Sequence, residues 1–119
     1  MSEARDGDPK KLLEFESSLK RLGGDEELFK EFVEIFFEDT PELMKGIEEG
    51  LNVSDARAVE KSAHALKGLV SNFGAKDFVD ISSEIEKSGR EGSLADSPKD
   101  FKKLQRLYET LCVELKAHV

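Results

Sequence analysis

The sequence predicts an all-α protein, an antiparallel up-and-down four-helix bundle with an additional N-terminal helix. Apolar residues recur at steps of three and four along most of the chain, and no segment shows the two-residue alternation of a half-buried strand. Turn residues, chiefly Gly, Asp and Pro, divide the 119 residues into long segments joined by short connections. Short connections between long amphipathic helices favour antiparallel neighbours in a single domain.

The N-terminal part is expected to be a leader followed by one helix. Residues 1–8 are polar and acidic and are expected to be a flexible leader, which leaves 9–119 as the domain. Pro9 can occupy the first turn of a helix over 9–22, because its fixed φ suits that position. Gly23-Gly24 is expected to end this helix.

The second segment, 25–51, is rich in phenylalanine. Asp25 is a good N-cap residue, and the acidic residues after it suit the positive end of the helix dipole. Pro41 removes one hydrogen bond from the interior of the segment. We therefore expect one kinked helix, with two helices broken near Asp39-Thr40 as the alternative.

Three further amphipathic segments complete the bundle. Ser54 or Asp55 is expected to cap the first of them, and Gly74 follows it. A loop rich in Gly, Ser and Asp, 89–98, precedes the last. The helices are expected over 56–73, 76–88 and about 98–117.

Composition and charge exclude several classes of protein. Acidic residues outnumber basic ones 26 to 18, and this net charge of −8 argues against binding to nucleic acid or to anionic membranes. The lone Cys112 excludes an internal disulfide or a multi-thiolate metal site, and its register indicates a core position. No apolar run is long enough to span a membrane, and the start lacks the apolar stretch of a secretory signal. We expect a cytoplasmic protein.

The segment 56–73 places a histidine on the outside of the bundle. At about 100° per residue, one apolar stripe forms along this helix and points inward. The stripe consists of Val59, Leu66, Val70 and Phe73. His64 lies roughly opposite it. Lys67, Gly68 and Ser71 follow within a turn or two on the same outer side.

These residue types suit the transfer of a phosphoryl group. A neutral imidazole is a nucleophile near neutral pH. Lys67 can meet the negative oxygens as a flexible point charge, and Ser71 can donate a hydrogen bond. Gly68 costs about 1 kcal/mol relative to alanine inside a helix, and clearance for a partner or for the phosphoryl group would explain it. The alternative is a solvated surface histidine with an ordinary lysine and an incidental glycine.

The residues around His64 resemble the signature of histidine-containing phosphotransfer (HPt) domains. The string His-Ala-Leu-Lys-Gly at 64–68 and the string Ser-Asn-Phe-Gly-Ala at 71–75 carry the resemblance. The acidic stretch with a proline at 36–43 is similar to the second helix of that family. The resemblance covers roughly residues 12–117. The chain departs from the pattern where Leu69 and Val70, rather than small residues, follow the Lys-Gly pair.

The resemblance implies a phosphorelay carrier in two-component signal transduction, not an enzyme. His64 would accept a phosphoryl group from the aspartyl phosphate of a response-regulator receiver domain and pass it to another receiver. Lys67 would stabilise the phosphoryl oxygens, and Gly68 would leave room for the partner. The metal and the catalytic aspartates would belong to the receiver or to a hybrid histidine kinase, so the chain itself would hold no metal and no cofactor.

The resemblance also implies a role for the helix at 76–88. In some relatives, a polar side chain there hydrogen-bonds the second imidazole nitrogen, and counting without gaps places Glu86 at that position. A carboxylate on Nδ1–H would leave Nε2 free to attack. The alternative is a solvated glutamate.

The surplus of aromatic residues on the second helix predicts a docking patch for the receiver. Phe29, Val33, Phe36 and Phe37 cannot all point inward, and exposed apolar area would serve docking. Ala65 and Leu69 are expected to extend the patch on the next helix. The alternative for each of these side chains is packing in a thick core.

Two other functions remain open. A helical adaptor would use the same apolar patch without needing His64. A phosphoacceptor module of a chemotaxis-type histidine kinase would share the fold and a similar motif. The brevity of the chain and its own Met1 favour a free-standing monomeric carrier, although an excised module would look the same. A ferritin-like metal site is disfavoured because Glu60 and Glu114 precede the histidines by four residues, not three.

Overall fold

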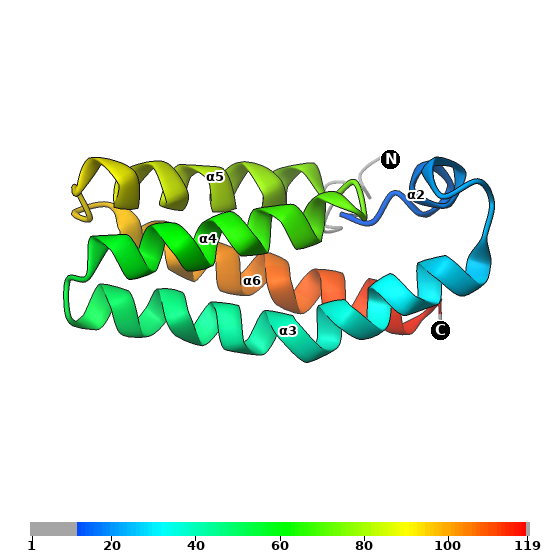
Figure 1. Cartoon of the computed structure of the whole chain (residues 1–119), viewed down its shortest axis with the longest axis horizontal. Helices are drawn as coiled ribbons and strands as arrows, with labels where there is room; N and C mark the ends of the chain where they lie inside the picture. Colours follow the sequence, from blue (N-terminus) through cyan, green and yellow to red (C-terminus); the bar gives the residue numbers. More distant parts are fainter. Residues whose placement is uncertain (1–11, 119) are drawn as a thin grey trace, which may run out of the picture.

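The computed structural model describes residues 12–118, which form five helices and contain no strand. The helices are α2 (Phe15–Arg21), α3 (Glu26–Asn52), α4 (Ala56–Ser71), α5 (Lys76–Glu91) and α6 (Ser97–Lys116). Helices α3 to α6 run alongside one another in alternating directions, and α2 lies at one end of this bundle (Figure 1). The predicted all-α bundle with an additional N-terminal helix is confirmed.

Helix α3 is continuous through Pro41, so the alternative of two helices broken near residues 39 and 40 is wrong. Asp25 caps the helix as expected, because its carboxylate accepts a hydrogen bond of 3.0 Å from the N–H of Leu28. Pro41 has no N–H to donate to the carbonyl group one turn before it in the helix. Because Pro41 is exposed, water can hydrogen-bond this carbonyl group instead. The free energy lost with this one hydrogen bond is therefore smaller than the free energy gained by burying the apolar stripe of the helix, and the helix stays continuous.

The first helix is shorter than predicted, because residues 12–14 are not helical. The backbone N–H groups of Leu12 and Leu13 donate to the carboxylate of Glu114 on α6, with distances between 2.8 and 3.1 Å. The N–H of Glu14 donates to the carbonyl of Phe73 at 3.0 Å. These hydrogen bonds to other parts of the chain hold residues 12–14 against the end of the bundle. The predicted leader, 1–8, and the start of the predicted helix lie outside the described residues.

Helix α5 continues three residues past its predicted end, through Gly89 to Glu91. Sequence reasoning placed Gly89 in the loop, but it is buried against α4. A Cβ at this position would lie 2.7 Å from both the carbonyl oxygen of Ala56 and the amide nitrogen of Glu60. The glycine therefore lets the backbones of α4 and α5 approach closely. The left-handed turn falls instead at Gly92, where φ is 73°.

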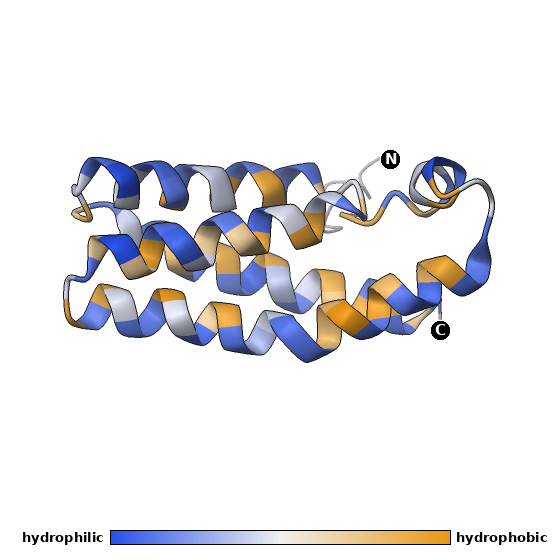
Figure 2. Cartoon of the chain, viewed as in Figure 1, coloured by the Kyte–Doolittle hydropathy of each residue, from blue (hydrophilic) through white to orange (hydrophobic). Residues whose placement is uncertain are grey.

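The core is lined by the inward stripes of all four bundle helices. Apolar residues concentrate on the faces that turn toward neighbouring helices, and the N-terminal half of α3 carries a dense run of them (Figure 2). The predicted docking patch is wrong for three of its members, since Phe29, Val33 and Phe36 are at most 2% exposed. Phe29 packs against Phe15 of α2, and Phe36 packs against Phe73, which follows α4, and Tyr108 of α6. Several neighbouring elements together therefore cover a wider apolar stripe than one neighbour would.

Phe37 is half-buried and lies on the side of α3 that faces α6. Its ring packs edge-on against Phe36, with centroids 5.4 Å apart. The ammonium group of Lys116 stands 5.9 Å from its centroid. The phenylalanine surplus of α3 thus belongs to the core and its border with α6, not to a surface beside His64.

Candidate functional site

His64 stands midway along α4, with 68% of its side chain exposed. The neighbouring helix α5 carries Glu86 opposite it, and the distance from Nδ1 of the imidazole to Oε2 of the carboxylate is 2.7 Å. Glu86 is itself buried, with only 8% of its side chain exposed. An exposed imidazole is therefore held from below by a buried acceptor.

Three basic side chains lie close to the carboxylate of Glu86. Its second oxygen, Oε1, lies 2.7 Å from the ammonium nitrogen of Lys67. Arg90, one turn further along α5, approaches Oε2 to 3.7 Å. The bond from Lys67 is the main cause that holds the pKa of Glu86 below its ordinary value; burial opposes it and the bond with His64 adds to it. Glu86 is thus a carboxylate at neutral pH and accepts a hydrogen bond from Nδ1–H, so in the neutral imidazole the lone pair is on Nε2.

We expect the free energy of unfolding to depend on the ionisation of Glu86. Its pKa is lower in the folded state than its ordinary value of 4.5, so the stabilisation is complete above that pH and is lost as pH falls through the folded pKa. Glu86→Gln should destabilise the protein by about 1–3 kcal/mol at neutral pH, because Lys67 loses its buried carboxylate partner. Chemical denaturation between pH 2 and pH 7, a range of ordinary carboxyl titration, measures both effects.

The control for this prediction is Glu91→Gln, which removes an exposed carboxylate from the same helix. This variant should keep the wild-type dependence on pH, whereas Glu86→Gln should flatten it in the acidic range. An equally steep acid transition in Glu86→Gln would show that other carboxylates dominate it.

Gly68 and Ser71 lie on the exposed side of α4, as expected. A Cβ built on Gly68 would have no atom within 4 Å, so nothing inside the molecule requires a glycine there. The hydroxyl of Ser71 donates to the carbonyl oxygen of Gly68 at 2.8 Å, and it lies about 10 Å along the helix axis from His64. The structure therefore brings His64, Lys67 and Glu86 together but leaves Ser71 apart from them.

Gly68→Ala is expected to stabilise the protein by about 0.5–1 kcal/mol, because alanine has the higher helix propensity and the space is open. Gly89→Ala is the matched control and should destabilise by about 1–3 kcal/mol, since its Cβ would collide with the backbone of α4. Thermal or chemical denaturation of both variants measures this difference. Loss of stability in Gly68→Ala would reveal an internal packing role for that glycine.

The two remaining predicted docking residues are both at least partly accessible to solvent. On α4, Ala65 is exposed and Leu69 is half-buried. Of the predicted patch members on α3, by contrast, Phe29, Val33 and Phe36 are buried. Sequence reasoning missed the basic groups Arg57, Lys61 and Arg90 that surround His64 in the cleft between α4 and α5. Their spacing from His64 and from Glu86 by whole helical turns was the available signal.

The described residues contain neither a cluster of metal-ligating side chains nor a helix that could span a membrane. Within residues 12–118, no group of three or more His, Cys, Asp or Glu side chains is arranged to hold a metal ion. In the same part of the chain, every helix is too short or too polar to cross a membrane.

Comparison with known proteins places these features in a family. No curated protein matched the chain. The fold is similar to the crystal structure of histidine-containing phosphotransfer protein B (HptB) from Pseudomonas aeruginosa PAO1, with a TM-score of 0.82 and 24% sequence identity over 92% of this chain and 95% of that chain. The family model of the Hpt domain matches residues 31–114, most of the bundle, and the chain therefore belongs to the Hpt domain family.

Proposed function

We propose that this Hpt domain is a phosphorelay carrier whose phosphoacceptor is Nε2 of His64. The observation that carries the proposal is the exposed imidazole with its Nδ1 bound at 2.7 Å to the buried carboxylate of Glu86. This contact fixes the tautomer and the ring orientation, so the nucleophilic nitrogen faces solvent, where a partner can reach it.

On the carrier, the transfer step needs only an exposed imidazole whose second nitrogen is held by a carboxylate. The lone pair of Nε2 attacks the phosphorus of an aspartyl phosphate, and the bond from phosphorus to the aspartate oxygen breaks. The aspartate leaves as a carboxylate with that electron pair. The imidazole becomes cationic while its Nδ1–H still donates to Glu86, whose negative charge stabilises the product. The reverse step returns the phosphoryl group to a second aspartate.

Lys67 and Gly68 have supporting roles in this proposal. The ammonium group of Lys67 has three donors, so it can keep its 2.7 Å bond to Glu86 and still donate to a phosphoryl oxygen one turn above. Gly68 leaves open space where a larger side chain would stand between the partner and His64. Because no step needs a metal or cofactor on this chain, we place the metal and the catalytic aspartates in the partner.

The proposed partners are receiver domains of response regulators or of a hybrid histidine kinase. The proposed setting is the cytoplasm, and the proposed state is a monomer. An adaptor without phosphotransfer and the phosphoacceptor module of a chemotaxis-type kinase remain the alternatives.

Phosphotransfer from labelled receiver domains tests the function. Incubation with a panel of phosphorylated receivers should give label on this protein that is labile in acid and stable in base, as expected of a phosphohistidine. No label across a broad panel would favour the adaptor. Label from a kinase with ATP, but none from receivers, would favour the chemotaxis-type module.

A further inference from the structure

Helices α4 and α5 lie side by side (Figure 1), and two of the contacts between them are about one helical turn apart. The first is the 2.7 Å hydrogen bond between His64 and Glu86. At the second, the backbone of Gly89 lies against the backbone of Ala56 and Glu60. On α5, Gly89 follows Glu86 by three residues. On α4, Glu60 precedes His64 by four residues, so the spacing of the helices at the second contact also sets their spacing at the first.

The close approach of the two helices is what requires a glycine at position 89. A Cβ on this buried residue would lie 2.7 Å from both the carbonyl oxygen of Ala56 and the amide nitrogen of Glu60. The three nearest atoms all belong to the backbone of α4, so no side chain can rotate to make room. Gly89 is inside α5, where glycine lowers helix stability, and the left-handed turn that favours glycine falls at Gly92. Gly89 therefore serves the contact between the helices.

A side chain at position 89 would move Glu86 away from His64. Helices are stiff, so the clash would separate the backbones of α4 and α5 by several tenths of an ångström. The contacts of Glu86 with Nδ1 of His64 and with Nζ of Lys67, both 2.7 Å, are at the short end of the range for charged hydrogen bonds, and both would lengthen. Glu86 is only 6% exposed, so the packing around it limits how far its side chain can follow.

A longer contact would also favour a competing donor. Arg90 directly follows Gly89, and its guanidinium lies 3.7 Å from Oε2 of Glu86, the same oxygen that His64 binds. A guanidinium can donate to both oxygens of a carboxylate, so Arg90 replaces the imidazole once the imidazole has moved away. His64 then loses the hydrogen bond that sets its tautomer. The form with a proton on Nε2, which has no lone pair there, becomes populated.

We propose that Gly89 is a positioning residue for phosphotransfer, because it keeps α4 and α5 close enough for Glu86 to hold His64 in the tautomer with the lone pair on Nε2. The inference rests on the proposed function and adds to it a residue that touches neither the imidazole nor the phosphoryl group. Gly89 acts only through the distance between two helices. A loss of stability alone does not move a proton between ring nitrogens, so the structural role and the positioning role can be measured separately.

Gly89→Ala tests the proposal by nitrogen-15 NMR of the imidazole, at alkaline pH and at a temperature where the variant is folded. In the wild-type protein, the proton should lie on Nδ1 of His64. In the variant, a substantial fraction of the molecules should carry it on Nε2, and the spectrum distinguishes the two because protonated and unprotonated ring nitrogens resonate in different ranges. Labelling by phosphoramidate, a small phosphoryl donor, should slow about tenfold, because the nucleophile is displaced. A wild-type tautomer in folded Gly89→Ala would overturn the proposal.

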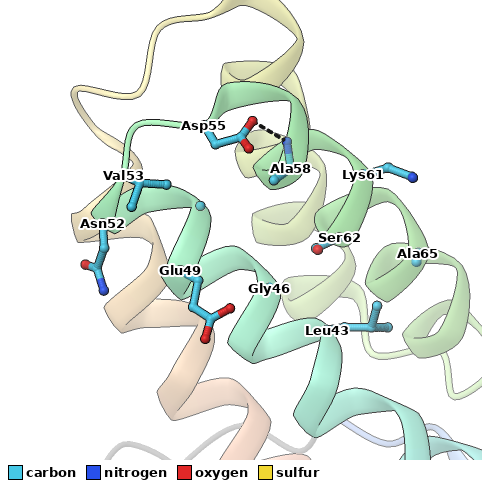
Figure 3. Close-up of a pocket in the computed structure, with 11 residues that line it drawn as sticks. Leu43, Gly46, Glu49, Asn52, Val53, Asp55, Ala58, Lys61, Ser62 and Ala65 are labelled. Carbon is cyan, nitrogen blue, oxygen red and sulfur yellow. Dashed lines mark hydrogen bonds between the residues drawn. The ribbon is translucent and has the colours of Figure 1, made fainter.

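The matched control is Gly50→Ala, at the contact between α4 and its other neighbour, α3. Gly50 lines the open groove between these two helices (Figure 3), and a Cβ there would lie 2.7 Å from Cγ2 of Val59. This variant should also lose stability, but it leaves the contact between α4 and α5 in place. It should keep the wild-type tautomer of His64 and the wild-type rate of labelling by phosphoramidate. Equal changes in both variants would show that any loosening of the bundle has this effect, and would overturn the specific role of Gly89.

Glu86→Asp gives a second test that does not depend on the folding of Gly89→Ala. The aspartate side chain is one methylene shorter, so the carboxylate is withdrawn from His64 while the helices keep their close contact. The variant should show the same shift of tautomer and the same slower labelling. In the double variant, the two effects should add to less than their sum in free energy, because both act on one contact. A wild-type tautomer in Glu86→Asp would overturn the proposal, since the reach of the carboxylate would then not matter.

Transfer from phosphorylated receiver domains separates this proposal from the proposed function. Equal rates of transfer to the wild-type protein and to folded Gly89→Ala would overturn the positioning role while the carrier function stands. A wild-type protein that no receiver labels would overturn the carrier function, and with it the role of Gly89 in transfer, whatever the NMR spectrum shows of the tautomer.

Discussion

The His64→Gln variant is expected to take no phosphoryl group from any receiver that labels the wild-type protein. Glutamine has no nucleophilic nitrogen, so the loss should be complete instead of partial. His64 is 68% exposed and contributes no core packing, so the variant should remain folded. Label that survives acid or persists in the variant would place the acceptor elsewhere.

His118→Gln is the matched control, because the sequence contains only two histidines. The ring of His118 stacks on Phe15 at 4.1 Å, at the far end of α6 from the cluster around Glu86. This variant should keep full transfer. Equal loss in both variants would indicate that the imidazole at 64 is not the only acceptor.

The Phe36→Ala variant is expected to lose about 3–5 kcal/mol of unfolding free energy, the largest effect on stability that we predict. Phe36 is completely buried, and its ring meets those of Phe73 and Tyr108 with centroids 5.7 and 5.9 Å away. Its removal would leave a cavity where α3, α4 and α6 meet. Chemical denaturation measures the loss.

Phe37→Ala provides the comparison, since this neighbour is half-buried and should cost less. At a temperature where both variants are folded, Phe36→Ala should still accept label on His64. A Phe36→Ala variant with wild-type stability and impaired transfer would contradict the assignment of this residue to the core. It would restore the docking role that its sequence position first suggested.

The number of helices, their inward stripes and the exposed position of His64 could be predicted from the sequence. Each of these features depends on the 3.6-residue repeat and on local turn signals. Both signals can be read within a single segment, without knowing what the segment packs against. The contact between Glu86 and His64 followed from the resemblance to HPt domains, not from spacing, because the two residues are on different helices. The end of α5 was predicted three residues too early, before Gly89. The glycine is there because α5 packs closely against α4, and this too is a contact between helices that the sequence does not show.

The sequence by itself determined the class of fold and placed an imidazole, an ammonium group and a bare glycine on one face of one helix. Only the tertiary structure decided which phenylalanines are buried, because a wide apolar stripe on α3 is covered by three neighbouring elements at once. Only the tertiary structure gathered Lys67, Arg90 and His64 around the carboxylate of Glu86. Helical periodicity fixes the direction in which a side chain points from the axis of its own helix. The distance between side chains on different helices depends instead on how closely the two helix axes approach each other. In this protein, glycines at the helix contacts allow that close approach.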